Sequence, residues 1–177
     1  SRWLHEHALP SSSLWVGMPR DTFGYRGGGE TLLIAGGIGI TPILPMAEDL
    51  AASGAPWRLL YTARGAGRHA FGRRLEGFAE AVLWSSVETG RLSVRGELER
   101  IAPGCAVYCC GPEGLVSEVR EVAADLGIGE RVRTELFSAE AEALRDGDTA
   151  FTATLRRSGR EIEVPAGTTL LERLGEA

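Results

Sequence analysis

The residues best suited to chemistry begin with a glycine-rich stretch, AGGIGITP at positions 35–42. An apolar run at 32–34 precedes it and predicts a buried strand, so the stretch joins a strand to a helix. Glycine permits positive φ and the close approach of a ligand to the backbone. We expect Thr41 to cap the helix and Pro42 to be its first residue, with free amides facing a pyrophosphate. A glycine-rich turn that binds no ligand is the alternative.

A second strand-to-helix junction reads YCCGP at positions 108–112. Ligands of open α/β sheets bind at the carboxyl edge, which would be formed here by Cys110, Gly111 and Pro112. We expect Cys105 and Cys109 to be small buried apolar residues. Adjacent cysteines form no C-x-x-C pair, and no histidine is near them in sequence, so we expect no metal site.

The ends of two further strands carry candidate binding residues. Dinucleotide-binding sheets usually place an acidic residue after the second strand, where it binds the ribose. Here YTARG at 61–65 ends that strand, and no acid occurs before Glu76. Arg64 could contact an adenosine ribose or phosphate, or be a solvated surface residue. Glu135 and Phe137 end the fifth strand, where a surface carboxylate and a core aromatic are the default interpretations.

Several classes of function find no support in the sequence. It has no G-x-S-x-G nucleophile elbow and no Walker motif, and its basic residues are all arginine. A net charge of -5 opposes nucleic acid and anionic membranes as partners. Glycines and prolines interrupt the longest apolar stretch, 31–47, so we expect no membrane helix. Three closely placed cysteines offer no disulfide framework, which favours a reducing, cytoplasmic setting.

The elements that must position these residues alternate between strand and helix, which predicts a parallel, doubly wound α/β sheet. We expect strands at 31–35, 57–62, 81–86, 105–109 and 131–136, and helices at 42–53, 72–80, 97–101 and 112–126. Before them we expect only a short helix at 3–8 and a short strand at 14–16.

The chain changes character after the fifth strand. Residues 138–149 are small and acidic and predict a linker. Alternating apolar residues on either side of Ser158-Gly159 predict an antiparallel hairpin over 150–164, and Thr169 with Glu172 predicts a capping box that opens a helix. Position 1 is not methionine and the last helix has no clear stop signal, so we expect a piece of a longer protein.

Three segments, LLIAGGIGITPILPMA, YCCGPEGLVSEV, and TELF followed by FTATLRRSGREIEVPAGTTLLERL, resemble the phthalate dioxygenase reductase family. This family includes vanillate demethylase reductases and belongs to the ferredoxin reductase-like superfamily. The resemblance covers essentially the whole chain. It implies four parts: the end of a flavin-binding β-barrel (1–28), a five-stranded parallel pyridine-nucleotide-binding domain (29–137), a linker (138–149), and the first hairpin and helix of a truncated β-grasp [2Fe-2S] ferredoxin domain (150–177).

The resemblance also implies roles for single residues. The flavin phosphate would be bound at Ser1, and the nicotinamide and pyrophosphate at Gly36, Gly37, Gly39, Thr41 and Pro42. Cys110, Gly111 and Pro112 would border the nicotinamide ring, and Thr62 and Arg64 the adenosine. Phe137 would pack beside the flavin, and Glu135 would lie along the hydride path. Thr41, Cys110 and Glu135 are therefore the candidate catalytic residues.

The function implied is that of an oxygenase reductase. A hydride would pass from NADH to FMN, and single electrons would pass on to a [2Fe-2S] cluster and a Rieske-type terminal oxygenase. The cluster cysteines would lie beyond Ala177. FAD and NADPH are the alternative cofactors, NADPH because Gly65 stands where many relatives have an acid. Two other functions stay open: a flavin or ferredoxin reductase that serves another acceptor, and a dinucleotide-binding fragment without activity.

Overall fold

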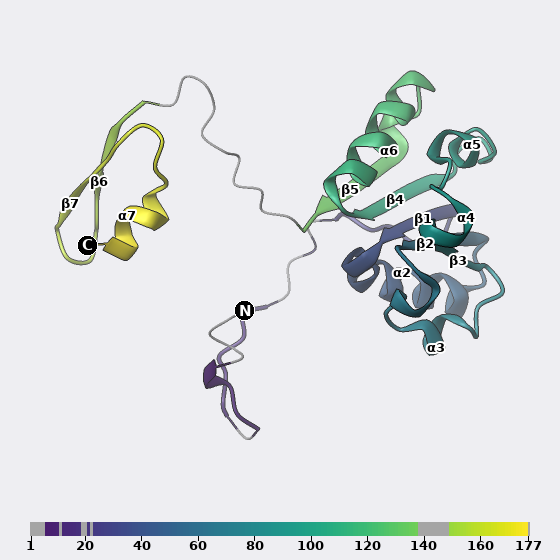
Figure 1. Cartoon of the computed structure of the whole chain (residues 1–177), viewed down its shortest axis with the longest axis horizontal. Helices are drawn as coiled ribbons and strands as arrows, with labels where there is room; N and C mark the ends of the chain where they lie inside the picture. Colours follow the sequence, from purple (N-terminus) through teal and green to yellow (C-terminus); the bar gives the residue numbers. More distant parts are fainter. Residues whose placement is uncertain (1–5, 11, 19–20, 22, 138–148, 177) are drawn as a thin grey trace.

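The computed structural model describes residues 6–10, 12–18, 21, 23–137 and 149–176. Its main feature is a five-stranded sheet in the order β3-β2-β1-β4-β5, in which all neighbouring strands are parallel (Figure 1). The strands are β1 (Thr31–Gly36), β2 (Trp57–Ala63), β3 (Ala81–Ser85), β4 (Ala106–Gly111) and β5 (Val132–Leu136). The predicted parallel, doubly wound sheet is thus confirmed.

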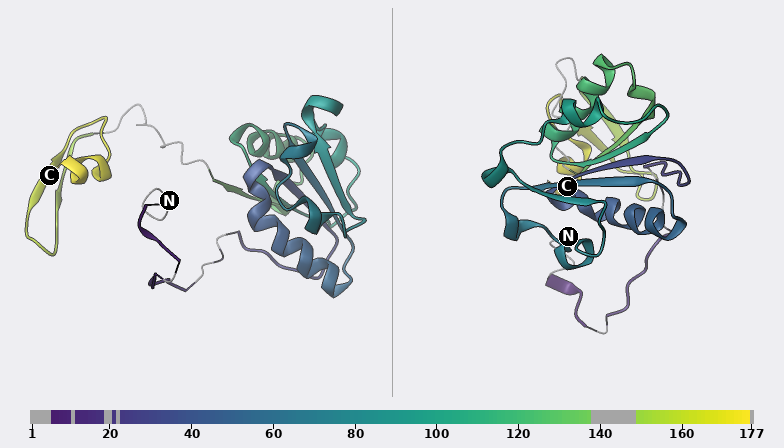
Figure 2. Two further views of the ribbon diagram at one scale, coloured as in Figure 1. Left: turned by 60° about the horizontal axis from the view of Figure 1, so that its bottom comes forward. Right: turned by 90° about the vertical axis from the view of Figure 1, so that its right-hand side faces the viewer.

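Helices cover both faces of this sheet. The longer ones are α2 (Ile40–Ser53) and α6 (Glu113–Asp125), and they lie on opposite sides of the sheet in Figure 2, where α2 is blue and α6 green. The shorter ones are α3 (Gly72–Leu75), α4 (Ser86–Thr89) and α5 (Val94–Leu98). No helix in the described ranges is both long enough and apolar enough to cross a membrane.

Two apolar clusters fill the space between the helices and the sheet. Because strand side chains alternate between faces, Leu33 and Ala35 of β1 pack with α2, whereas Leu32 and Ile34 pack with α5 and α6. The α2 side also receives Phe23 from the N-terminal segment, whose ring meets Tyr108 edge to face at 5.7 Å. Burial on both faces explains why these strands read as continuous apolar runs.

Several expected elements differ from the observed ones. The helix expected at 72–80 is the single turn α3, after which hydrogen-bonded turns at Phe78 and Ala81 lead the chain into β3. The turn expected at 97–101 is α5, three residues earlier, because the Ser93 side chain caps it by accepting from Gly96 N. Residues 14–16 form no strand, since no described strand lies alongside to hydrogen bond with them. Of the helix expected at 3–8 the structure describes residues 6–8, of which 6 and 7 are helical and 8 is not.

The C-terminal part contains the expected hairpin. Strands β6 (Phe151–Thr154) and β7 (Glu161–Val164) pair antiparallel, and Gly159 adopts φ 69° in the turn. Helix α7 (Leu170–Glu176) begins with the expected capping box. Glu172 N donates to Thr169 Oγ1 at 3.2 Å, and Thr169 N donates to Glu172 Oε2 at 2.8 Å.

Candidate functional site

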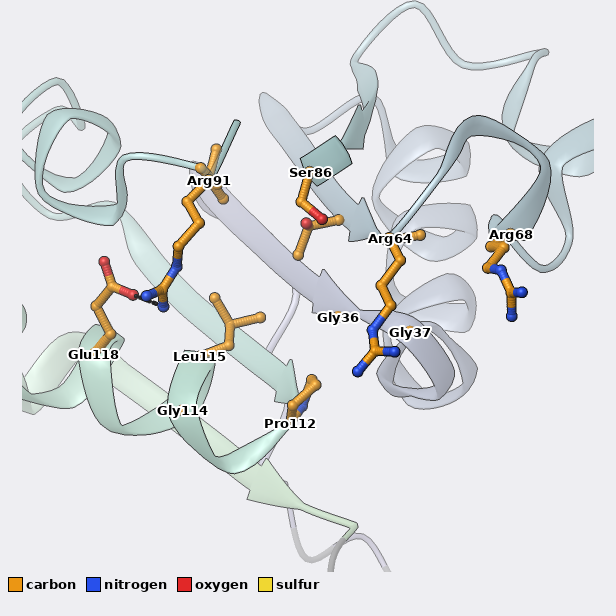
Figure 3. A pocket seen from close by; sticks show the side chains of 13 residues that line it. Gly36, Gly37, Arg64, Arg68, Ser86, Arg91, Pro112, Gly114, Leu115 and Glu118 are labelled. Carbon is orange, nitrogen blue, oxygen red and sulfur yellow. Dashed lines mark hydrogen bonds and ion pairs between the residues drawn. The ribbon is translucent and has the colours of Figure 1, made fainter. Parts of the chain in front are cut away.

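A cavity of about 820 Å³ opens at the carboxyl edge of the sheet, beside the N-terminal half of α6 (Figure 3). It lies where the strand order reverses between β1 and β4, which is the usual ligand position in open α/β sheets. Its lining comes from the ends of β1 and β2, from the segments around β3 and α4, and from α6: Gly36, Gly37, Thr62, Ala63, Arg64, Arg68, Ser86, Arg91, Leu92, Pro112, Gly114, Leu115 and Glu118.

Glycines allow the loops after β1 and β4 to interlock. A Cβ added to Gly39 would lie 2.2 Å from the carbonyl oxygen of Cys110, and one added to Gly36 would lie 2.6 Å from Pro112 Cδ. A Cβ on Gly111 would meet the backbone of Gly36 at 3.0 Å. These three glycines are therefore required by contact between the two loops, before any ligand is considered.

Gly37 differs from its neighbours. Its φ is +53°, and a Cβ added there would meet nothing within 4 Å, because the residue faces the cavity. Its carbonyl accepts a hydrogen bond from the Tyr61 hydroxyl at 3.0 Å. The same hydroxyl accepts from Ala70 N at 3.0 Å, so the fully buried Tyr61 connects the glycine loop to the loop after β2. Burial raises the pKa of Tyr61, which keeps the hydroxyl protonated and able to donate.

The start of α2 differs from the expectation for Thr41 and Pro42. A 3-10 turn, η1 (Gly37–Gly39), leads into the helix, which begins at Ile40. Thr41 is thus inside the first turn, where its hydroxyl donates to the Ile38 carbonyl at 2.9 Å instead of capping the helix. Pro42 is the third helical residue. The prediction of a threonine cap was wrong because the 3-10 turn starts the helical hydrogen bonding earlier.

The wall of the cavity carries an excess of positive charge. Arg64, Arg68 and Arg91 line it, and Glu118 is the one carboxylate among the described lining residues. Arg91 Nη2 donates to Glu118 Oε2 at 3.0 Å, as the dashed line in Figure 3 shows. Arg64 and Arg68 are exposed, and neither forms an ion pair with any described residue.

Cys110 and Glu135 lie on neighbouring strands in direct register, at the end of β4 and β5. Cys110 is fully buried. Burial, and secondarily the nearby Glu135 carboxylate, raise the pKa of its thiol to about 11. Glu135 lines a second hollow of about 450 Å³ together with Pro42. The thiol therefore stays neutral at ordinary pH, and the carboxylate is accessible from the side of α2.

The expected site residues thus fall into separate groups. Those that line the larger cavity are Gly36, Gly37, Thr62, Arg64 and Pro112, and those that line the smaller hollow are Pro42 and Glu135. Gly39, Thr41, Cys110 and Gly111 are in the lining of neither one: Gly39 ends η1, Thr41 is in the first turn of α2, and Cys110 and Gly111 end β4. Phe137 follows β5 with 45% of its surface exposed, and Ser1 lies outside the described residues.

Other residues at the cavity were not predicted from the sequence. Arg68, Ser86, Arg91 and Glu118 line the cavity and belong to no motif, and Tyr61, whose hydroxyl donates to Gly37 O, reads as one more apolar residue of a buried strand. Position in the fold could have predicted some of these lining residues, because residues just after the second and third strands reach the same edge of the sheet as the glycine loop. That signal would have singled out Arg68 and Ser86, whereas Arg91 and Glu118 depend on packing between distant segments.

Comparison with known proteins gives a consistent set of relatives. The chain is 38% identical over 177 residues to the carnitine monooxygenase reductase subunit of Escherichia coli, covering 97% of this chain and 54% of that protein. It is 38% identical to the vanillate O-demethylase oxidoreductase of Pseudomonas putida, over 94% of this chain and 54% of that protein. No family model matches the chain.

Among solved structures, phthalate dioxygenase reductase matches with a TM-score of 0.59 and 31% identity, over 90% of this chain and 50% of that structure. It is described as a modular structure for electron transfer from pyridine nucleotides to [2Fe-2S]. The present chain therefore spans about half the length of each of these three relatives.

Proposed function

The chain belongs to the phthalate dioxygenase reductase family, and from this we propose that it is the nucleotide-binding part of an oxygenase reductase. The whole protein would take a hydride from a reduced nicotinamide dinucleotide and deliver electrons, through flavin and a [2Fe-2S] cluster, to an oxygenase component. We also propose the division into barrel end, nucleotide domain, linker and ferredoxin part at residues 28, 137 and 149. A Rieske-type oxygenase is the partner that best fits this family.

The larger cavity is the observation that carries this proposal. It combines an open glycine with positive φ, backbone of two strand-to-helix loops, and two arginines without ion-pair partners among the described residues. A dinucleotide needs such a combination, because its pyrophosphate requires close backbone approach and positive charge. A volume of about 820 Å³ falls within the range typical of small-molecule and cofactor sites.

The chain's own residues would hold and orient the nicotinamide end. The reducing chemistry belongs to the dinucleotide and the flavin when they are bound. Cys110, Gly111 and Pro112 would form an uncharged border, since the thiol remains protonated. Thr41, whose hydroxyl donates to the Ile38 carbonyl, would help fix the glycine turn η1. Glu135 would add a carboxylate on the side of the smaller hollow.

The flavin and the cluster are supported to different degrees by these residues. The half-exposed Phe137 offers an aromatic face at the end of β5, next in sequence to the exposed Leu136. For the cluster, the described residues contain no group of cysteines or histidines that could hold a metal, and Cys105, Cys109 and Cys110 are all buried. We propose that the flavin phosphate is bound at Ser1 and that the cluster is held by cysteines outside the described residues.

Visible absorption of the protein made from the whole gene tests the proposal. We expect a flavin and iron-sulfur spectrum that bleaches when reduced dinucleotide is added without oxygen. A spectrum that persists with both NADH and NADPH would refute the reductase function. Dinucleotide binding without bleaching would instead support the alternative of a binding module.

A further inference from the structure

Resting on the proposed dinucleotide site, we propose that the adenosine end of the larger cavity binds a 2′-phosphate, so that the protein uses NADPH in preference to NADH. The residues concerned are Arg64 and Arg68, after β2, and Ser86, after β3. All three line the cavity and come from the segments after β2 and β3, whereas Gly114, Leu115 and Glu118 line it from α6 (Figure 3).

The absence of a free carboxylate there argues against an unmodified ribose. Sheets that select NADH place an acidic side chain after the second strand to accept hydrogen bonds from the ribose hydroxyls. Here that segment supplies Thr62, Ala63 and Arg64 to the cavity, and the segment after β3 supplies Ser86. Glu118 is the single carboxylate of the described lining, and its Oε2 already accepts from Arg91 at 3.0 Å. A ribose hydroxyl would therefore meet the hydroxyls of Thr62 and Ser86 but no free carboxylate among the described lining residues.

The positive charge of the same wall favours a phosphate. Arg91 and Glu118 neutralise each other, which leaves the charges of Arg64 and Arg68 uncompensated by ion pairs within the described chain. A phosphate monoester carries about −1.5 to −2 charges at pH 7 and three acceptor oxygens. Arginine binds such a group through several N–H donors at once. Ser86 could add a hydroxyl donor.

The loop that carries the two arginines is held in place before any ligand binds. The His69 ring lies within hydrogen-bonding distance of three backbone carbonyls, with Nδ1 3.1 Å from Ala66 O and Nε2 3.2 Å from both Tyr61 O and Trp84 O. Ala70 N donates to the Tyr61 hydroxyl. A loop ordered in advance loses less entropy on binding, so its arginines can contribute more to affinity.

Two adenosine probes separate this inference from the proposed function. Adenosine 2′,5′-bisphosphate and 5′-AMP differ only in the 2′-phosphate, and calorimetric titration of this chain measures both without flavin. We expect the bisphosphate to bind at least about tenfold more tightly, which is the effect of one charge-assisted hydrogen bond. NADP⁺ should show the same advantage over NAD⁺, and the advantage should shrink as salt is raised.

Substitutions assign the effect to the two arginines. Arg64→Ala and Arg68→Ala should each weaken binding of the bisphosphate by about tenfold, and each should weaken binding of 5′-AMP by less than that. Arg73→Ala is the matched control, because Arg73 is also exposed and lies nearby in sequence but does not line the cavity. It should change neither affinity.

Three results would contradict the 2′-phosphate inference or the dinucleotide site, and they can be told apart. Equal binding of the two probes, or tighter binding of NAD⁺ than of NADP⁺, would overturn the 2′-phosphate inference and leave the reductase proposal intact. If Arg73→Ala also lost affinity for the bisphosphate, the overall positive charge of the chain would explain the effect, and the 2′-phosphate inference would again be overturned. If none of the four nucleotides bound, the dinucleotide site itself would be refuted.

Discussion

The hydroxyl of Tyr61 joins the two loops that flank the cavity, so its removal tests how the site is organised. Tyr61→Phe keeps the fully buried ring and deletes only the oxygen. The Gly37 carbonyl then loses its donor at 3.0 Å, and the Ala70 amide loses its acceptor at 3.0 Å. Each hydrogen bond contributes about 0.5–1.5 kcal/mol net, so the free energy of unfolding should fall by about 1–3 kcal/mol.

Binding should weaken as well, because the dinucleotide must then order both loops itself. If about 1 kcal/mol of the lost interaction is transferred to binding, the dissociation constant rises roughly fivefold. Urea unfolding followed by Trp57 fluorescence measures the stability, since this tryptophan is buried in the neighbouring part of β2. Calorimetric titration with NADP⁺ and NAD⁺ measures the affinity.

Tyr108→Phe is the matched control. Tyr108 is also buried in a central strand, and its hydroxyl accepts one hydrogen bond, from Arg26 N at 3.0 Å. Its partner Arg26 does not line the cavity, whereas Gly37, the partner of Tyr61, does. Loss of the Tyr108 hydrogen bond should cost about 1 kcal/mol of stability and leave the affinity unchanged. If Tyr61→Phe bound dinucleotide as well as the unaltered chain, or if Tyr108→Phe weakened binding equally, the coupling through Tyr61 would be wrong.

Two further predictions concern the interlocked loops. Gly39→Ala should lower the free energy of unfolding by about 3 kcal/mol or more, because the new Cβ would lie 2.2 Å from Cys110 O. Gly114→Ala is the control: its Cβ would meet nothing within 4 Å, so the change should be neutral or slightly stabilising. Equal urea midpoints for the two variants would contradict this prediction. Burial raises the pKa of Cys109 to about 12 and of Cys110 to about 11, so the thiols of the unfolded chain, with pKa about 8.5, ionise first. Stability should therefore be complete below about pH 8.5 and fall as pH rises toward 11, and Cys110→Ala should reduce the slope; a urea midpoint independent of pH would contradict it.

The sheet could be predicted because its signal is local. The central strands β1, β2 and β4 are largely apolar and buried on both faces, and β1 and β4 lead into helices with an apolar stripe, so period and burial agree there. The hairpin at 151–164 and the capping box at Thr169 depend on neighbouring residues alone, and both are confirmed. The helix expected at 72–80 was overestimated because Leu75 and Phe78 pack on the α2 side of the sheet from a single turn followed by hydrogen-bonded turns.

The site could be predicted only where a motif marks it. Gly37 and Pro112 are in recognisable strand-to-helix junctions, and both line the cavity. The cap predicted at Thr41 was wrong because the 3-10 turn η1 starts the helical hydrogen bonding before it, so that α2 begins at Ile40. Tyr61 was missed because its strand position predicts only burial, and the partners of its hydroxyl are 24 and 9 residues away.

The glycines of the two junctions show why a motif and a site are different things. Positions 36, 39 and 111 require glycine because the loops after β1 and β4 touch each other there. A Cβ added at any of the three would lie only 2.2 to 3.0 Å from the nearest heavy atom of the other loop. Gly37 alone combines positive φ with open space toward the cavity. Three glycines therefore fix the distance between the loops, and the fourth leaves room for a ligand. The two junctions lie where the order of the strands reverses, so the fold itself shapes the cavity. We expect the charges around the cavity, above all those of Arg64 and Arg68, to decide which ligand it binds.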